Sequence, residues 1–298
     1  MLQFDSLDAR IASRLVAQAR FESEPLEALA DQSLLQLREE RKWAAQHSGV
    51  VVRVREALDR ALRTEEVEYL DRPDIPTQMK IEIVSELHKF NRKLRSYERW
   101  FSVLEPLLRR INERKGRPAR LLELACGHGE FTLRCSEMAR DRGLQIEPTG
   151  SDVVAPYLEA SAKAAKERGI KAEFRRLNAF AMDDVADGAY DVAFIGQSIH
   201  HFTAGQVARM IAECRRTCTT AFVGVDGRRS LITMGVAPVY GFLATGSRAY
   251  AHDSIVSTRK FYSDSELRMI AELSARGAPV EVRRLVPGYT ALVVTFLP

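Results

Sequence analysis

The stretch that decides the fold is LLELACGHGEFTLR, residues 121–134. Its apolar run predicts a buried strand that ends near Glu123. The chain is then expected to turn through Gly127 and Gly129 and to begin a helix at about Glu130. Glycines let the backbone pass close to a ligand, and the first turn of a helix has free N–H groups. Because ligands of open α/β sheets bind beyond the carboxyl ends of the strands, this turn is expected to hold a nucleotide-like cofactor.

On the C-terminal side of this turn, short β-rich runs alternate with helical ones. We expect strands near residues 120–125, 145–151, 172–177, 190–196, 220–226, 280–286 and 290–297. Helices near 130–142, 155–168, 204–217 and 263–276 separate most of them. This alternation predicts a mostly parallel sheet with helices on both faces. Only Pro287 and Gly288 join the last two runs, and so short a turn predicts a terminal antiparallel hairpin.

The N-terminal side is helical almost throughout, from about residue 5 to 114. After Pro73 and Pro76, one long helix is expected to begin at Thr77 as N-cap, with an apolar stripe that continues to Ile111. Basic residues interrupt that stripe between 89 and 99, and they indicate either a solvated face or a phosphate-binding surface. We therefore expect two parts, a helical cap or dimerisation region (residues 1–115) and an α/β domain (residues 116–298).

Composition excludes several classes of protein. The 298 residues are 46% hydrophobic, with a net charge of +4 and a pI near 8.9. That content is too apolar for a disordered chain, and the charge alone does not indicate nucleic-acid binding. No uninterrupted apolar run of about 18 residues exists to span a bilayer, and the acidic N-terminus is unlike a secretory signal. Four cysteines without CxxC pairs predict neither a disulfide framework nor a metal cluster, so we expect a reduced, cytoplasmic protein.

The glycine turn departs from two common nucleotide motifs. Thr132 occupies the position of the third glycine of a dinucleotide fingerprint, and the Gly-Lys-Ser/Thr ending of a P-loop is missing. Instead, Glu123 precedes Gly127 and Gly129, with Ala125 where a first glycine is common. Here the sequence resembles the class I S-adenosylmethionine-dependent methyltransferases. The resemblance covers about residues 115–298, includes the closing hairpin, and implies a Rossmann-like fold that binds S-adenosylmethionine.

The resemblance also implies a set of cofactor contacts. Asp152, with Val153 beside it, follows the second strand and matches the acidic residue that binds the ribose hydroxyls; the alternative is an N-cap of the following helix. The adenine is expected near Asn178, Ala179 and Phe180, with Asp183 and Asp184 as alternatives. The fourth strand ends in Gln197, which is expected to face the methionine portion. Glu123, Ala125, Gly127 and Gly129 complete the expected site.

Three histidines are candidates for proton transfer. The fourth strand continues into His200 and His201, and a histidine near neutral pKa can take a proton from a nucleophile. The long connection at 226–262 is expected to be a substrate lid, and it contains His252 next to Asp253. A purely structural role is the alternative for each of these histidines.

The sequence therefore predicts an enzyme that transfers a methyl group from S-adenosylmethionine to a small-molecule acceptor, such as a secondary metabolite, a quinone or a lipid-like compound. Two alternatives stay open. One is an RNA methyltransferase that uses the basic helix, which is disfavoured because Gln197-Ser-Ile-His stands where base-amine methylating enzymes carry an Asn/Asp-Pro-Pro-Tyr/Phe tetrapeptide. The other is a non-catalytic cofactor-binding partner protein. A homodimer is also possible.

Overall fold

A single sheet forms the centre of the molecule. The computed structural model describes residues 2–19 and 24–296. Within them, seven strands are arranged in the order β3-β2-β1-β4-β5-β7-β6. These are β1 (Ala119–Leu124), β2 (Ile146–Asp152), β3 (Glu173–Arg176), β4 (Tyr190–Gly196), β5 (Cys218–Gly227), β6 (Val280–Leu285) and β7 (Tyr289–Thr295). β1 to β5 pair in parallel, while β7 is antiparallel to both β5 and β6. The predicted Rossmann-like fold with a terminal hairpin is confirmed; residue 297 of the last predicted strand lies outside the described residues.

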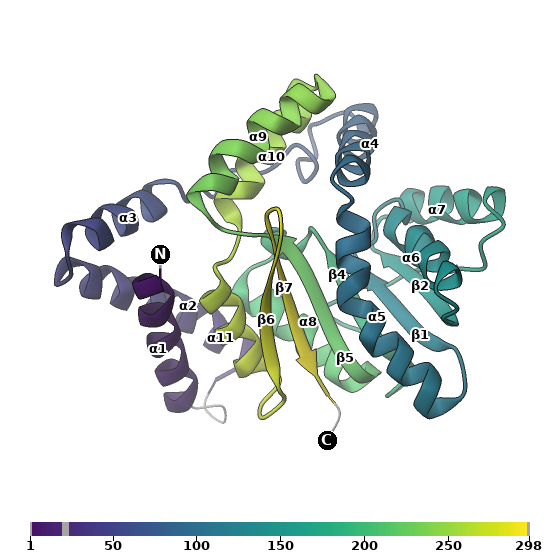
Figure 1. Ribbon diagram of the computed structural model, residues 1–298, viewed down its shortest axis with the longest axis horizontal. Helices are drawn as coiled ribbons and strands as arrows, with labels where there is room; N and C mark the ends of the chain where they lie inside the picture. The colour runs from purple at the N-terminus through teal and green to yellow at the C-terminus, as the bar shows by residue number, and fades with distance from the viewer. Residues whose placement is uncertain (1, 20–23, 297–298) are drawn as a thin grey trace.

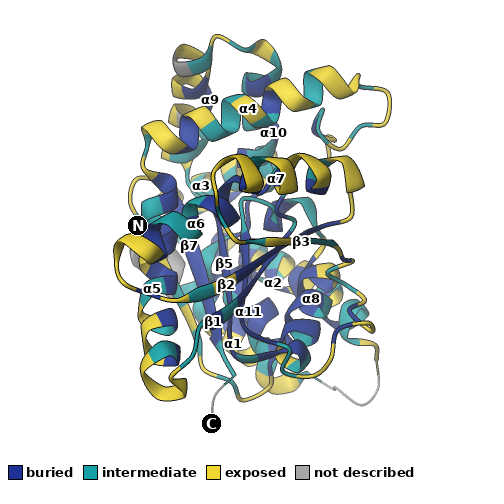
Figure 2. Cartoon of the chain, turned by 90° about the vertical axis from the view of Figure 1, so that its right-hand side faces the viewer, coloured by how far each residue is buried: buried dark blue, intermediate teal, exposed yellow. Residues whose placement is uncertain are grey.

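The central strands are apolar on both sides because helices cover both faces of the sheet. In β1, Leu121 packs in a core with α5 (Ser96–Lys115) and α6 (Glu130–Asp141). Its neighbour Leu122 points the other way, into a core with α8 (Ala204–Thr217) and α11 (Asp264–Ser274). Figure 2 shows the strands buried between helices whose outer sides are exposed. α7 (Ala155–Glu167) lies along β2 and β3.

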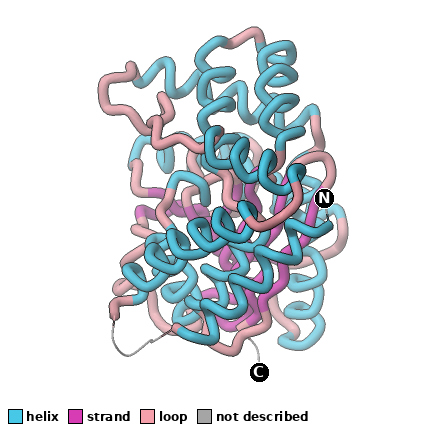
Figure 3. The backbone as a smooth tube through the Cα atoms, turned by 90° about the vertical axis from the view of Figure 1, so that its left-hand side faces the viewer, coloured by secondary structure: helices cyan, strands magenta, loops and turns pink. Residues whose placement is uncertain are grey.

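The helices before the sheet do not form one separate body. α1 (Leu2–Gln18) and α2 (Leu26–Gln46) pack against α8 and α11, on one face of the sheet. Figure 3 views the molecule from the left-hand side of Figure 1 and shows helices in front of the strands. α5 covers the other face, while α4 (Thr77–Lys93) packs on the helices that follow β5. α3 (Val50–Ala61) leads from α2 into a segment without regular structure, residues 62–76. The predicted division at 115/116, and the role of the first part as cap or dimerisation region, stay predictions.

The predicted long helix from Thr77 to Ile111 is wrong: it is two helices. α4 ends before Leu94, and Arg95 adopts a left-handed φ of 52° before α5 begins at Ser96. The break lets α4 pack on the helices of the connection at 226–262 while α5 packs on the sheet, which one straight helix could not do. The apolar stripe continues across the break, so its spacing alone could not reveal it. Thr77 is not the N-cap either, since the helix follows Pro76 without a side-chain cap.

The connection at 226–262 contains two helices, α9 (Leu231–Thr245) and α10 (Arg248–Lys260). They pack on each other and on α4, beyond the carboxyl ends of the parallel strands (Figure 1). α9 exposes large apolar side chains, among them Ile232 (73% exposed) and Leu243 (75% exposed). Among the described residues, none of the helices combines the length and the apolar character needed to cross a membrane.

One buried carboxylate connects several elements at the end of the sheet where the parallel strands begin. Asp191, at the start of β4, is fully buried and lies 2.6 Å from Lys115 Nζ and 2.7 Å from Arg117. It also accepts the backbone N–H of Arg120 and the hydroxyl of Thr219. Burial alone would raise the pKa of Asp191, but the hydrogen bonds from Arg117 and Lys115 outweigh it and hold the pKa well below its usual range. This carboxylate therefore links α5, β1, β4 and β5.

Replacing this carboxylate should make the protein less stable in a pH-dependent way. We expect Asp191→Asn to lower the free energy of unfolding by about 2 kcal/mol at pH 7, because the hydrogen bonds to a charged acceptor are lost. The folded pKa is depressed, so this stabilisation is present above the unfolded value near 4 and is lost on acidification below it. Urea unfolding at pH 7 and pH 3.5 measures both effects. Asp187→Asn is the control, since Asp187 is an exposed partner of Arg216; equal losses in both variants would contradict the expectation.

Candidate active site

The glycine turn has the backbone geometry that its sequence predicts. Ala125, Gly127 and Gly129 all adopt left-handed conformations, with φ of 49°, 52° and 67°. The N–H of Cys126 donates to the carbonyl of Ser151 in β2 at 2.9 Å, which joins the turn to the neighbouring strand. α6 begins directly after Gly129. The first N–H groups of α6 therefore lie next to the ends of β1 and β2.

Asp152 contacts the glycine turn. Its Oδ2 accepts the N–H of Gly127 at 2.9 Å, and its Oδ1 accepts the N–H of Val154 at 2.9 Å. The N-cap of α7 is Val154, so Asp152 is not the helix cap that was its alternative role. Val153 is exposed beside it. Each carboxylate oxygen accepts one of these N–H groups and has a second lone pair available to a ligand.

Glu123 is buried beneath the turn. Its carboxyl group accepts a hydrogen bond from the hydroxyl of Thr132, the residue that replaces the third glycine of a dinucleotide fingerprint. Burial raises the pKa of Glu123 to about 8, although the hydrogen bonds of Thr132 oppose the rise. Thr132 therefore serves as a local partner for a buried acid, which a glycine could not do.

The residues predicted near the adenine follow β3. Asn178 is exposed, and its side chain accepts the N–H of Phe180 at 3.0 Å. Phe180 makes an edge-to-face contact with Phe202, with ring centroids 5.1 Å apart. Ala179 is half-buried against the core. Of the two alternatives, Asp184 pairs with Arg175.

Gln197 connects the end of β4 to α4. Its backbone is left-handed, with φ of 53°, and its N–H donates to Val225 at 2.8 Å. The side-chain Oε1 accepts from Asn91 Nδ2 at 2.6 Å, and Asn91 is buried. This hydrogen bond joins α4 to the strand end at which the methionine portion was predicted.

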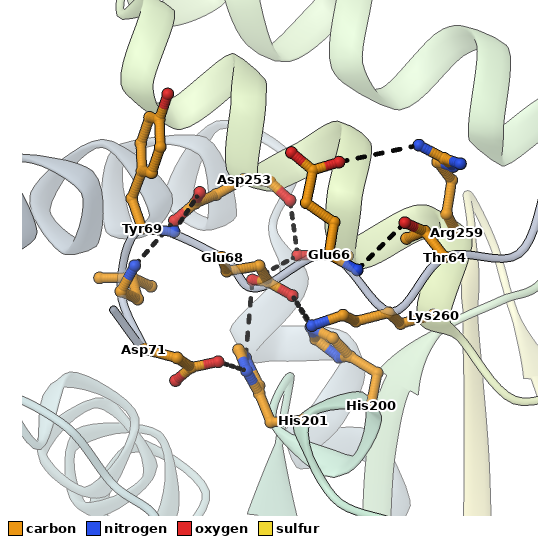
Figure 4. A network of polar contacts seen from close by, with 12 residues as sticks. Thr64, Glu66, Glu68, Tyr69, Asp71, His200, His201, Asp253, Arg259 and Lys260 are labelled. Carbon is orange, nitrogen blue, oxygen red and sulfur yellow. Dashed lines mark hydrogen bonds and ion pairs between the residues drawn. The ribbon is translucent and has the colours of Figure 1, made fainter. Parts of the chain in front are cut away.

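The histidine pair lies in a short 3₁₀ turn, η1 (Ile199–His201), directly after β4. His200 is buried; its Nδ1 lies 2.9 Å from Asp226, and its Nε2 lies 3.5 Å from Glu68. Burial alone would lower the pKa of His200, but the carboxylates of Asp226 and Glu68 raise it to about 10. His201 Nδ1 lies 2.7 Å from Asp71, and its Nε2 lies 3.7 Å from Glu68 (Figure 4).

His252 belongs to the same network but does not adjoin the pair. It lies on α10 and stacks on Tyr69, with ring centroids 3.9 Å apart. Its ring nitrogens lie 3.0 Å from Asp253 and 3.1 Å from Glu66. Asp253 in turn accepts the N–H groups of Tyr69 and Leu70. Asp253 thus fixes the backbone of residues 66–71, which we call the acidic segment.

Sequence reasoning missed the acidic segment. Glu66, Glu68 and Asp71 lie in the run EEVEYLDRPD. The histidines that they contact are 130 residues or more further along the chain. The one sequence feature that could have indicated this segment is a cluster of acidic residues before Pro73 and Pro76. The cluster lies where the sequence shows no helical or strand-like spacing of apolar residues. Such a cluster ordinarily indicates a solvated loop, so nothing in the pattern connected it to the end of β4.

Comparison with known proteins agrees with this geometry. Residues 121–220 match the family model described as a methyltransferase domain. The sequence matches no curated protein. Among solved structures, the fold is similar to the plantazolicin methyltransferase BamL, solved with a triazolic desmethylPZN analog and SAH (16% identity, TM-score 0.55, 80% of this chain and 97% of that chain). It is also similar to the plantazolicin methyltransferase BpumL, solved with a monoazolic analog and SAH (13% identity, TM-score 0.55, 88% and 98%).

At these identities the structural neighbours establish the fold, and the family match establishes the class. The chain contains a class I S-adenosylmethionine-dependent methyltransferase domain. S-adenosylmethionine is the cofactor of the family to which this domain belongs.

Proposed function

We propose that this enzyme transfers the methyl group of S-adenosylmethionine to a small-molecule acceptor by in-line displacement. The observation that carries the proposal is the position of the histidine pair. η1 follows β4, which pairs with β1, so the histidines and the glycine turn lie at the same edge of the sheet. A donor held at the turn and an acceptor held near the histidines can be aligned there.

The donor side uses the residues predicted for the cofactor. Glu123, Ala125, Gly127 and Gly129 form the turn for its amino-acid tail. Asp152, with Val153, is the partner of the ribose hydroxyls, and the second lone pairs of its carboxylate support that role. Asn178, Ala179 and Phe180 border the adenine, and Gln197 borders the methionine portion.

The acceptor side is enclosed by α4, α9, α10 and the acidic segment. Of the three histidines, His201 is the best placed to meet an acceptor, since its side chain is 17% exposed. His200 is buried with a carboxylate near each ring nitrogen, and His252 is held between Asp253 and Glu66. The exposed apolar side chains of α9 support residues 226–262 as a lid for an apolar acceptor, quinone-like or lipid-like.

The reaction breaks the bond between sulfur and the methyl carbon and forms a bond from that carbon to the acceptor atom. S-adenosylhomocysteine leaves with the electron pair of the broken bond. If the acceptor is a hydroxyl, its proton passes to a neighbouring base, for which His201 is the proposed group. Water must be kept out, and α4, α9 and α10 over the sheet edge are the elements proposed to do this.

The main alternative function is methylation of RNA. The ion pairs of the basic residues between 89 and 99 argue against it. Lys89 pairs with Glu86, and Arg92 pairs with Glu130 across to α6. Arg95 pairs with Glu98. Charges that already have acidic partners are less available to phosphates.

The test follows a labelled methyl group and compares two carboxylate variants. The protein is incubated with methyl-labelled S-adenosylmethionine and a cell extract separated into RNA, protein and small molecules; label in RNA, or in no fraction, would overturn the proposal.

We expect Asp152→Ala to weaken S-adenosylmethionine binding at least tenfold, about 1.4 kcal/mol, as measured by calorimetry. Asp187→Ala, an exposed carboxylate far from the turn in sequence, should bind like the wild type. Equal affinity in both variants would remove the ribose assignment.

A further inference from the structure

Three potential metal ligands converge at the end of β4. Glu68 comes from the acidic segment, and His200 and His201 come from η1. One ligand atom from each lies within 4.8 Å of the other two. Figure 4 shows the Glu68 carboxylate next to the histidine side chains. Sequence spacing did not suggest a metal site, because the carboxylate is so distant in the chain.

Both imidazoles are oriented for coordination through Nε2. Asp226 lies 2.9 Å from Nδ1 of His200, and Asp71 lies 2.7 Å from Nδ1 of His201. A carboxylate on one ring nitrogen keeps a proton there, and a bound metal ion takes the place of the second proton, on Nε2. Carboxylate–histidine pairs of this kind support the ligands of many protein metal sites. Here two such pairs direct their Nε2 atoms to one carboxylate.

The distances suit a bridging ion better than direct hydrogen bonds. Nε2 of His200 lies 3.5 Å from Glu68 Oε1, and Nε2 of His201 lies 3.7 Å from Oε2. A charge-assisted N–H···O bond measures about 2.7–2.9 Å. Two ligands bound about 2.0–2.1 Å from a tetrahedral zinc ion lie roughly 3.3 Å apart.

Two atoms of the group also lack a hydrogen-bond partner. Glu68 Oε1 and His200 Nε2 are both buried without a hydrogen bond, and Glu68 is only 2% exposed. The other oxygen of Glu68 accepts from Ser257 at 2.8 Å. Lys260 Nζ lies 3.9 Å from Oε1 and is a competing cation, but its side chain is 17% exposed and can turn outward. A buried polar atom without a partner is costly, and a bound cation would satisfy both.

We propose that Glu68, His200 and His201 form a binding site for a divalent transition-metal ion of the zinc type. Two imidazoles and one carboxylate suit zinc, cobalt or ferrous iron, whereas magnesium and calcium prefer oxygen ligands alone. Three protein ligands leave at least one coordination position open. If the proposed function holds, an acceptor hydroxyl bound at that position would lose its proton more readily, and in the metal-bound enzyme the ion would activate the acceptor in place of His201 as the base. Only this role rests on the proposed function; the ion site itself does not.

Metal binding is measured on the full chain without cofactor or acceptor. After chelator treatment and dialysis, the protein is titrated with Zn²⁺ by calorimetry and with Co²⁺ by visible absorption. We expect one equivalent to bind with a Kd below about 1 μM, and Co²⁺ to give the bands of a low-coordinate site. Glu68→Gln and His201→Asn should each weaken Zn²⁺ binding about a hundredfold. His47→Asn removes an exposed histidine and is expected to leave the affinity unchanged.

Two outcomes would overturn the site. One is the absence of Zn²⁺ binding to the wild type at 100 μM, a concentration of about 100 times the expected Kd. The other is a Zn²⁺ affinity that is the same in the wild type, Glu68→Gln and His201→Asn. Thermal unfolding of each variant shows that the fold is intact. Because no methyl transfer is measured, this result and the labelled-methyl experiment can fail independently.

Discussion

Gly129→Ala is expected to lower the free energy of unfolding by about 3 kcal/mol. Gly129 has a φ of +67°, and a side chain in that conformation costs about 1–2 kcal/mol. An added Cβ would also lie 2.6 Å from Phe174 and 2.8 Å from the Ser161 hydroxyl. Forcing extra volume into packed surroundings adds about 1–3 kcal/mol. Urea unfolding of the variant and the wild type measures the sum.

Gly127→Ala is the matched control for this prediction. Gly127 has a similar φ of +52°, but nothing lies within 4 Å of an added Cβ. Its loss of stability should therefore be about 1–2 kcal/mol, from the backbone alone. The open space is where the proposed cofactor tail would lie, so this variant should still lose affinity for S-adenosylmethionine. Equal losses of stability in the two variants would show that Phe174 and Ser161 do not restrict the turn.

The second large effect is expected from Glu266→Gln. Glu266 is fully buried in the first turn of α11 and lies 2.8 Å from both Arg38 and Arg63. These arginines come from α2 and from the segment after α3. Burial alone would raise the pKa of Glu266, but the charges of the arginines hold the pKa well below its usual value. Removing the charge breaks a buried ion pair, which typically costs about 3–5 kcal/mol, although Arg63 keeps a second partner in Asp59. The side-chain oxygen of glutamine can still accept the N–H of Ser263, so the capping box at the start of α11 is retained.

Denaturant unfolding and limited proteolysis test this variant together. We expect the N-terminal helices of Glu266→Gln to be cleaved faster than those of the wild type. Glu272→Gln is the control in the same helix, because its pair with Arg268 is partly exposed and 3.9 Å long. Such pairs contribute about 0–1 kcal/mol. A Glu266→Gln variant as stable as Glu272→Gln would mean that this carboxylate does not hold the two parts of the chain together.

The sheet could be predicted from the sequence because its signals are local. Leu121 and Leu122 lie in one short apolar run between the basic stretch KGRPAR, residues 115–120, and the glycine turn. Pro287 with Gly288 leaves room only for a hairpin. The helix break at Arg95 could not be predicted, because the apolar stripe continues through it. α9 was also missed as a helix, since Gly235, Pro238 and Gly241 suggest a loop. Its packing on α10 and α4 outweighs these weak local preferences.

The site was predictable only where it follows the strands. Asp152 is the last residue of β2, and the histidine pair follows β4 within a few residues, so the order of elements indicated their position. Glu68 comes from a segment without periodicity, and its approach to His200 depends on the contacts of Asp253 with the backbone at Tyr69 and Leu70. Those contacts join α10 to residues nearly two hundred positions earlier. A pairing over that distance has no local signature.

The hydrogen bond between Asn91 and Gln197 has a consequence for ligand binding. Asn91 belongs to α4, which packs on α9 and α10, whereas Gln197 directly follows β4. If α9 and α10 form the proposed lid, a movement that admits an acceptor would also act on the strand end beside the proposed donor site. Binding of the donor and binding of the acceptor are then expected to be coupled.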